Sequence, residues 1–388
     1  MKTNLTHVNP APQTGLNNIK QTQIAVIGGG IIGLSVAFEC AKRGFKVTVI
    51  EKGQCGGQAT GAAAGMLAPY SEIGEDPDPF FALCQLSLSL YPEWQQEVKT
   101  VSGLDFEYVQ SGSLHVALHE ADELALETRL SWQQEWGVRG EIVKGEALRR
   151  LEPALTKEAV AALYYPDEHH LYAPDYVQAL IKACRKLGVE ILEQAGEVQF
   201  REIKEDGLLL AGDDVTVGAE LCILACGAWT AIYESVLGIR LPIFPIRGQI
   251  CAYHRHEEQI NHLIFFSQGY VLSKGNGTIV CGASEDIAGF DTSVTEQGIN
   301  RLVRFSRQLF PVLEGREPFH RWAGLRPATQ DGYPLLGPVD HYPNIILASG
   351  HYRNGILLSP ATGQVIADVI EGRNPKVNLD FFDPHRFS

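Results

Sequence analysis

The sequence predicts an α/β protein in which a parallel-sheet domain carries an inserted, mixed and largely antiparallel α+β domain. A strand–helix–strand unit at residues 24–51 predicts the parallel sheet. Buried-strand patterns at 221–225 and 344–348, each leading into glycine, extend that sheet. Between these blocks, residues 105–118 and 245–282 alternate apolar and polar side chains around turn signals. Such alternation is typical of antiparallel strands.

The composition is that of a globular protein and argues against several other classes. Of the 388 residues, 45% are hydrophobic and 20% are charged, which excludes a disordered chain. The 32 Lys and Arg against 46 Asp and Glu give a net charge of −14, which argues against nucleic-acid binding. No apolar run approaches the ~20 residues that span a bilayer, so no membrane segment is expected. The length fits roughly two to three domains, or two large ones.

The cysteines and the N-terminal segment bear on the location of the protein. The eight cysteines are scattered with no C-x-x-C pair, which predicts reduced thiols, no metal site and a cytoplasmic location. Residues 1–21 are rich in Asn, Thr, Gln and Pro and contain no apolar stretch of the kind that a secretory signal needs. We therefore expect a disordered tail, with ordered structure beginning near Gln23.

The first strand–helix–strand unit has clear boundaries. Residues 24–27 (Ile-Ala-Val-Ile) read as a short apolar strand, and a glycine-rich turn leads from it into a helix over residues 34–42. Gly44 ends this helix, and a second strand over residues 46–50 leads to Glu51. A β-α-β unit of this length predicts a right-handed parallel crossover.

Later segments supply the remaining elements of both domains. Helices are predicted over residues 80–100, 120–136, 176–187, 295–310 and 359–370, and a further strand over 189–192. The parallel-sheet domain is therefore expected to be discontinuous, comprising residues 22–80, 170–235 and 320–380. The inserted substrate domain is expected to comprise residues 81–169 and 236–319.

A G-x-G-x-x-G motif at Gly28, Gly30 and Gly33 lies between the first strand and the first helix. Gly28 permits the tight turn, Gly30 lets the backbone approach a pyrophosphate, and Gly33 lets the helix pack closely on the strand. The helix N-terminus offers unpaired N–H groups and partial positive charge to the phosphates. Glu51 can accept both ribose hydroxyls and would repel a 2′-phosphate, which disfavours NADP. The unit is predicted to be a Rossmann-like dinucleotide-binding domain rather than a structural glycine turn.

NAD and FAD both fit this motif, and the next segment favours FAD. Residues 53–65 consist mostly of Gly and Ala, with Thr60 among them. Small residues over this length would let the backbone lie against a large flat ring and its ribityl chain, although a flexible glycine loop is the alternative. The sequence also contains a single fingerprint of this kind, whereas an FAD-containing pyridine-nucleotide reductase would normally carry two.

Three longer motifs carry a resemblance to a known family. They are residues 60–67 (Thr-Gly-Ala-Ala-Ala-Gly-Met-Leu), 322–327 (Trp-Ala-Gly-Leu-Arg-Pro) and 350–358 (Gly-His-Tyr-Arg-Asn-Gly-Ile-Leu-Leu). Together with the glycine motif and Glu51, they resemble the D-amino acid oxidase family of FAD enzymes, and within it the glycine-oxidase-like members of the ThiO type. The resemblance covers most of the chain, from about residue 22 to residue 370.

The resemblance implies an activity and a mode of cofactor binding. The activity is FAD-dependent oxidative deamination of glycine, related small amines or D-amino acids by hydride transfer to flavin. Reoxidation by O2 would give an imine or keto acid, ammonia and H2O2, in the thiazole branch of thiamine biosynthesis, and the assembly would be a tetramer. Sarcosine-oxidase-like relatives hold FAD covalently through a cysteine near the segment 320–336. Since no cysteine follows Cys281 here, we expect non-covalent FAD.

The same resemblance implies which residues contact the cofactor. Ile31 and Ile32 would meet the pyrophosphate with the glycine loop, and Glu51 and Lys52 would meet the adenosine ribose. The adenine would lie against the backbone of Glu197 or its neighbour Val198. The residues expected along the ribityl chain and ring are Ala59, Thr60, Ala64, Gly65 and Met66. Those expected to close over the pyrimidine end of the flavin are His351, Tyr352, Arg353, Asn354, Gly355, Ile356 and Leu357.

A small amino acid presents a carboxylate, so its site needs a cation with fork geometry. Arg326 is the first candidate and Arg353 the second, and the resemblance adds Tyr270 as a hydroxyl that helps to hold the carboxylate. Gln268 and Glu285 are less typical of the family, and a charge at Glu285 could attract larger or amine-bearing substrates. No general base stands out, and His351 fits cofactor packing better; none is needed if a neutral amine loses its Cα hydrogen as hydride.

Three other functions compete with an oxidase. A D-amino acid dehydrogenase would pass its electrons to an acceptor other than oxygen, and a non-catalytic flavoprotein would bind without turnover. A plain NAD-dependent dehydrogenase is the least favoured. The sequence leaves open whether glycine, sarcosine or a D-amino acid is the best substrate.

Overall fold

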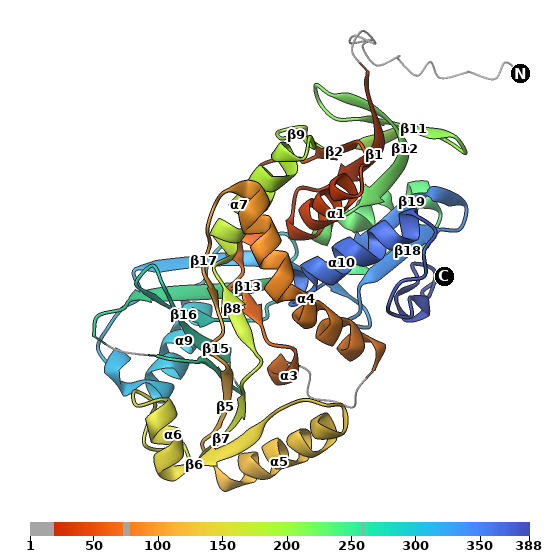
Figure 1. Cartoon of the computed structure of the whole chain (residues 1–388). Coiled ribbons are helices and arrows are strands. Elements are labelled where there is room, and N and C mark those ends of the chain that lie inside the picture. Colours follow the sequence, from red (N-terminus) through yellow and green to blue (C-terminus); the bar gives the residue numbers. More distant parts are fainter. Residues whose placement is uncertain (1–18, 73–77, 258–259, 268) are drawn as a thin grey trace, which may run out of the picture.

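The structure is a computed structural model that describes residues 19–72, 78–257, 260–267 and 269–388 (Figure 1). Most of the predicted tail, up to residue 18, and also Gln268 lie outside the described residues. The first strand, β1 (Lys20–Ile27), begins three positions before Gln23 because its N-terminal half still pairs with β12 (Thr216–Leu224).

The first sheet has eight strands and is parallel at its centre. β1 lies between β2 (Val47–Ile50) and β12, β12 also pairs with β19 (Tyr342–Ser349), and β2 pairs with β9 (Glu190–Leu192), all in parallel. Three antiparallel strands complete the sheet at its margins: β10 (Gln199–Lys204), β11 (Gly207–Ala211) and β18 (Leu335–Val339). The predicted parallel core is confirmed, and the antiparallel margins are additional.

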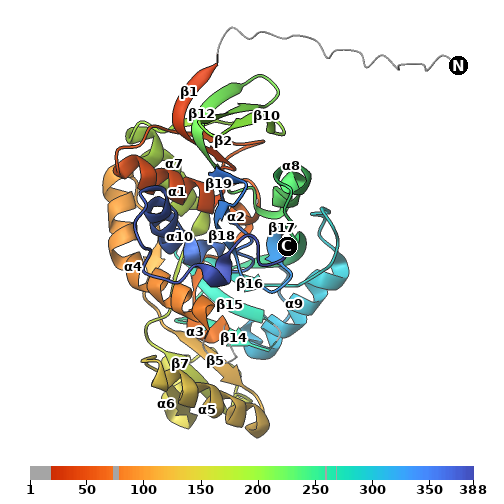
Figure 2. The ribbon, with the colours of Figure 1, turned by 90° about the vertical axis from the view of Figure 1, so that its right-hand side faces the viewer.

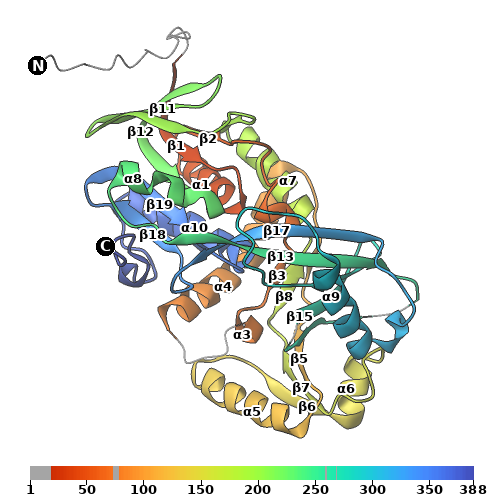
Figure 3. The same ribbon diagram turned by 180° about the vertical axis from the view of Figure 1, so that it is seen from behind.

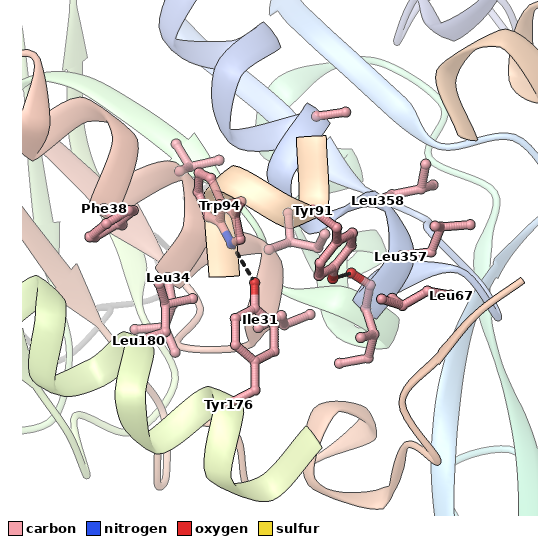
Figure 4. Close-up of a cluster of buried hydrophobic side chains, with 14 of the residues drawn as sticks. Ile31, Leu34, Phe38, Leu67, Tyr91, Trp94, Tyr176, Leu180, Leu357 and Leu358 are labelled. Atoms are coloured by element: carbon pink, nitrogen blue, oxygen red, sulfur yellow. Dashed lines mark hydrogen bonds between the residues drawn. The ribbon is translucent and has the colours of Figure 1, made fainter. Parts of the chain in front are cut away.

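Four helices pack together on one side of this sheet: α1 (Ile31–Lys42), α4 (Pro79–Ser102), α7 (Ala173–Lys186) and α10 (Gly355–Ile370). Figure 1 shows α1, α10, α4 and α7 side by side below the sheet. Their facing side chains form the largest buried cluster, in which Trp94 of α4 donates a hydrogen bond to the Tyr176 hydroxyl of α7 (Figure 4). This packing fixes the start of α1, where the glycine motif lies.

Helix α10 begins four residues earlier than predicted because Pro360 lies inside it rather than at its start. Proline lacks an N–H, so the carbonyl of Ile356 loses its ordinary helical partner. The Tyr91 hydroxyl of α4 donates to that carbonyl instead, and the Ser359 hydroxyl also reaches it at 2.9 Å. Tyr91 is fully buried beside Leu357 and Leu358 (Figure 4).

The second sheet also has eight strands and is antiparallel except where β14 meets β5. Its strands, in spatial order, are β17 (His320–Thr329), β13 (Ile243–His254), β16 (Thr278–Gly282), β15 (Gly269–Lys274), β14 (Leu263–Phe266), β5 (Ser113–Ala117), β7 (Ala161–Tyr165) and β6 (Glu141–Lys144). Residues 320–329, which the sequence placed in the parallel-sheet domain, form β17 and pair along β13 instead.

Helices pack against both ends of the second sheet. α9 (Glu296–Leu309) packs against β13 and β16, and Figure 2 shows it beside β16. α5 (Glu120–Glu135) packs against β5 and β7. α6 (Gly145–Leu151) lies with α5 at the end of the molecule away from the parallel sheet (Figure 3). The predicted helices over 80–100, 120–136 and 295–310 are confirmed as α4, α5 and α9.

Short elements complete the fold. A three-stranded sheet consists of β3 (Met66–Leu67), β8 (His169–Leu171) and β4 (Tyr108–Val109). The remaining helical turns are α2 (Ala59–Ala62), α3 (Pro69–Glu72), η1 (Gly227–Tyr233), α8 (Glu234–Leu237), η2 (Pro311–Leu313) and η3 (Asp380–Phe382). Over the described ranges, no helix is both long enough and apolar enough to cross a membrane.

Candidate active site

A cavity of about 1150 Å³ runs from the carboxyl ends of the parallel strands to the inner face of the second sheet. Its first part is lined where β1, β2, β12 and β19 end, at Gly28, Glu51, Cys226 and Gly350. Its second part is lined by β13, β14, β15 and β17. The carboxyl edge of an open parallel sheet is where nucleotides bind in this class of fold.

The three glycines of the motif have the geometry that their predicted roles require. Gly28 has φ +111°, and a Cβ on it would collide with the Ala225 carbonyl. A Cβ on Gly33 would collide with the Gly28 carbonyl, so Gly33 lies under the turn and does not line the cavity. Gly30 lines the cavity, and the nearest atom to a Cβ there would be the Thr60 hydroxyl oxygen at 3.5 Å. A ligand can therefore approach the backbone closely at Gly30.

Polar groups converge on this turn. Gly30 is the N-cap of α1 with no side-chain cap, and the Thr60 hydroxyl accepts a hydrogen bond from the Ile31 amide at 3.0 Å. The Glu51 carboxylate accepts from the Gly29 amide at 2.6 Å and from the Gly53 amide at 2.9 Å. A carboxylate has about four lone-pair sites, so Glu51 can still accept ribose hydroxyls. A helix N-terminus for phosphate beside a fixed carboxylate for ribose fits the adenosine diphosphate half of FAD.

The structure brings nearly all the predicted cofactor residues to this one cavity. Besides those named above, its lining includes Ile31, Ile32, Lys52, Ala59, Ala64, Gly65, Met66, Glu197, His351, Tyr352, Arg353, Asn354, Gly355 and Ile356. Two predicted residues, Gly33 and Leu357, are not in this lining. Leu357 is 1% exposed and packs into the helical core (Figure 4). The Ser87 hydroxyl donates to its carbonyl. The side chain of Leu357 therefore belongs to the core, and its expected contact with the flavin stays a prediction.

The segment after β19 is held in a fixed conformation. His351 is buried, its Nε2 lies 3.0 Å from the Thr362 hydroxyl, and burial lowers the pKa of His351 to about 3. It is therefore neutral at any working pH and has a structural partner. Tyr352 has φ +46°, which a non-glycine residue keeps only when its surroundings determine it. Its amide donates to the Pro327 carbonyl at 2.9 Å and its hydroxyl to Glu285 at 2.9 Å.

The two predicted carboxylate-binding arginines differ in their partners. Arg353 is already neutralised, since it lies 3.3 Å from Glu72 and 3.1 Å from Glu285, and these charges raise its pKa further. Arg326 on β17 donates from Nη1 to the Ser284 carbonyl at 2.8 Å, and no carboxylate of the described residues lies within 4 Å of it. Arg326 therefore keeps donors for a ligand anion, whereas Glu285 serves Arg353 and Tyr352.

Tyr270 faces the cavity from β15 and is 5% exposed. Burial raises its pKa, with Arg326 acting in the opposite direction, so the hydroxyl is a neutral donor and acceptor. Tyr270 and Arg326 belong to segments distant in sequence that the second sheet brings to one cavity.

Sequence reasoning missed two glycines that shape this part of the cavity. A Cβ on Gly248 of β13 would overlap the guanidinium of Arg326, and a Cβ on Gly282 of β16 would overlap the Tyr270 hydroxyl. A glycine inside a strand pattern often marks a close approach of another group, and that signal was present at Gly248.

Comparisons with known proteins agree with this geometry. The family described as FAD dependent oxidoreductase (DAO) matches residues 23–369. The chain is 33% identical to the glycine oxidase of Geobacillus kaustophilus over 92% of this chain and 94% of that protein. It is 32% identical to the bifunctional protein ThiO/ThiG of Trichormus variabilis over 94% of this chain and 55% of that protein.

A solved structure gives the same result for the fold. The crystal structure of glycine oxidase from Geobacillus kaustophilus superposes with a TM-score of 0.89 at 30% identity, covering 95% of this chain and 99% of that one. The Rossmann-like fold, the FAD cofactor and the resemblance inferred from the motifs are therefore confirmed. The chain belongs to the DAO family of FAD-dependent oxidoreductases and is an amino acid oxidase of the glycine-oxidase type.

Proposed function

We propose that this protein oxidises glycine and related small amines, with Arg326 as the anchor of the substrate carboxylate. One observation carries the proposal: Arg326 faces the cavity with the Tyr270 hydroxyl nearby, and no described carboxylate pairs with it. A charge in a partly buried site without a counter-charge is costly unless a ligand supplies one. An amino acid carboxylate is the ligand that the guanidinium fork fits best.

The chemistry that bound FAD supplies is two-electron oxidation of the C–N bond, with O2 as final acceptor and an imine or keto acid, ammonia and H2O2 as products. The protein supplies position and electrostatics. Arg326 and Tyr270 hold the carboxylate, and this fixes the depth of Cα in the cavity. Glu72 and Glu285 hold Arg353, so that the wall of the cavity beside the substrate is rigid.

The way in which FAD is held belongs to the same proposal. Contacts with Ile31, Ile32, Glu51, Thr60 and the segment from His351 to Ile356 would hold it without a covalent bond, since no cysteine follows Cys281. All eight cysteines are free thiols, which supports a cytoplasmic location for the protein. The similarity to proteins named ThiO/ThiG supports a place in the thiazole branch of thiamine biosynthesis, and a tetramer is the expected assembly.

The experiment that tests this function measures products under air. Purified holoenzyme is mixed with glycine, and H2O2 and ammonia are measured together over the first turnovers. An oxidase gives one H2O2 per ammonia. Oxidation of glycine with an artificial electron acceptor but without H2O2 would instead identify a dehydrogenase. If neither glycine, sarcosine nor small D-amino acids reduce the bound flavin, the protein is not an amine oxidase at all.

A further inference from the structure

Four arginines among the described residues line the cavity, and the presence or absence of an acidic partner divides them into two pairs. Arg353 lies against Glu72 and Glu285, and Arg301 of α9 lies 3.2 Å from Asp286. Arg326 and Arg129 have no carboxylate within 4 Å among the residues that the structure describes. Arg326 is assigned to the substrate carboxylate by the proposed function, whereas Arg129 has no assigned role.

Within the described part of the chain, the hydrogen-bond partners of Arg129 are all neutral. Its Nη1 donates to the Ser71 carbonyl at 3.3 Å and approaches His115 Nδ1 at 3.0 Å, and it also interacts with the Tyr165 hydroxyl. A guanidinium has five donors and no acceptor, so these contacts leave donors unused. The helix α5 that carries Arg129 is acidic on its exposed side, yet the described acids of that helix do not reach this side chain.

His115 adds a second donor beside Arg129. Burial, with the charge of Arg129 as the next cause, lowers the pKa of His115 to about 3, so the ring is neutral. Because an arginine can only donate, Nδ1 must be the acceptor and the ring proton must be on Nε2. His115 therefore contributes an N–H donor, and it lines the same cavity.

The second sheet joins this pair to the substrate site by a single row of side chains. Tyr270 on β15 lies opposite Phe265 on β14, and Phe265 lies beside His115 on β5. Ring centroids are 6.5 Å apart for Tyr270 and Phe265 and 6.2 Å apart for Phe265 and His115. Two strand spacings separate Tyr270 from His115, which is about 10 Å. An apolar ring thus lies between two anion-binding ends.

We infer that Arg129 and His115 form a second anion subsite, which binds a carboxylate at the far end of a substrate whose first carboxylate rests on Arg326. This inference rests on the proposed function for the role of Arg326. The substrate class is an amine with two carboxylates separated by a short apolar chain that crosses Phe265. The second carboxylate can be on the side chain of an amino acid or on the nitrogen substituent of an N-substituted glycine.

Binding without turnover tests the subsite directly. Holoenzyme is titrated by calorimetry with glutarate, adipate and pimelate, each against the monocarboxylate of equal carbon number. The best dicarboxylate should bind between about tenfold and a hundredfold more tightly than its partner, as expected for a charge-assisted hydrogen bond. Arg129→Gln should abolish this advantage, and Arg129→Lys should keep part of it. Arg150→Gln, which removes an exposed arginine of α6, should leave it intact.

Turnover identifies the source of the second carboxylate. One arm compares kcat/KM for D-glutamate and D-norvaline, and the other compares N-(2-carboxyethyl)glycine and N-propylglycine. Preference for the acidic member in either arm, lost in Arg129→Gln, supports the subsite and names the source. The readout is the ratio of the two kcat/KM values within each arm. General damage to the variant lowers kcat/KM for both substrates and therefore leaves this ratio unchanged.

The outcomes separate this inference from the proposed function. If the wild-type protein oxidises glycine but shows no dicarboxylate advantage in binding or in either arm, the subsite is overturned while the function stands. An advantage that survives unchanged in Arg129→Gln overturns it as well. If glycine is not oxidised yet adipate binds in a way that depends on Arg129, the subsite stands and the function fails.

Discussion

The guanidinium of Arg326 lies against the backbone of Gly248, where a Cβ built on Gly248 would be only 2.4 Å from the guanidinium carbon. Gly248 lies on β13 directly opposite Gly324, two residues before Arg326 on β17. The arginine therefore crosses back over the neighbouring strand through a gap that only glycine leaves. This crossing positions the guanidinium over the cavity.

Gly248→Ala should impair substrate binding without unfolding the protein. The new methyl group displaces the end of a flexible side chain, so the free energy of unfolding should change by less than about 1 kcal/mol. The displaced guanidinium should hold the carboxylate poorly, which raises KM for glycine roughly tenfold or more. Steady-state kinetics and thermal unfolding of the variant check both parts. Gly207→Ala on β11, outside the cavity, is the matched control, and equal KM values in the two variants would refute the steric account.

Glu51→Ala should weaken FAD binding by about tenfold to a hundredfold, because charge-assisted hydrogen bonds of roughly 1.5–3 kcal/mol are lost. The carboxylate also holds the Gly29 and Gly53 amides, so Glu51→Gln, which keeps one acceptor oxygen, should have a smaller effect. Fluorescence titration of apoprotein with FAD measures the dissociation constant. Glu193→Ala serves as control, since Glu193 accepts from the Cys55 amide in the same loop but does not line the cavity. An FAD affinity that is equal in all three variants contradicts the ribose assignment.

Glu168 should make the protein less stable as pH rises. It is fully buried below α3, where it accepts from the Tyr70 amide at 2.6 Å and the Ser71 amide at 2.8 Å, and burial raises its pKa from 4.5 to about 7. The folded state therefore binds a proton that the unfolded state releases. This contribution is fully present below about pH 4.5 and is lost as pH rises through about 7.

The size of this effect is up to about 3 kcal/mol. Glu168→Gln cannot titrate, so the stability of the wild type relative to the variant should fall between pH 5 and pH 8. Melting temperatures of both proteins at each pH measure the difference. A difference that is constant or that grows with pH would show that Glu168 is ionised throughout. Because α3 also carries Glu72, the same titration should loosen the wall that holds Arg353.

The parts of the fold that the sequence predicts are those with local causes. The strand ending at Ile27, the glycine turn and α1 follow from side-chain periodicity and glycine positions within a short segment. The place of β17 in the second sheet cannot be predicted in this way, because it depends on pairing with β13, which is distant in sequence. The strands β6 and β7 were missed for the same reason, since they are short and gain their stability from neighbours.

The residues of the candidate site likewise fall into those that local motifs predict and those whose position depends on the folded arrangement. Motifs predicted Arg326, Arg353 and Tyr270 as residues of the substrate site, but only the folded arrangement shows that Glu285 lies 3.1 Å from Arg353. Arg129 carried no signal in sequence, because an arginine on a charged helix is usually solvated. Its role depends on the packing of α5 over β5, which turns this one side chain toward the cavity.

The most direct test of the account is anaerobic reduction of the bound flavin by glycine in Arg326→Lys, measured by stopped-flow absorbance. Lysine keeps the charge but loses the fork, so the glycine dissociation constant should rise about tenfold to a hundredfold. Misplacing Cα by ~1 Å can slow reduction about a hundredfold, while the oxidised flavin spectrum should stay nearly unchanged. Arg321→Lys on the same strand and Arg353→Lys should have smaller effects. If Arg326→Lys binds glycine as tightly and is reduced as fast as wild type, Arg326 is not the carboxylate anchor and the proposed active site is wrong.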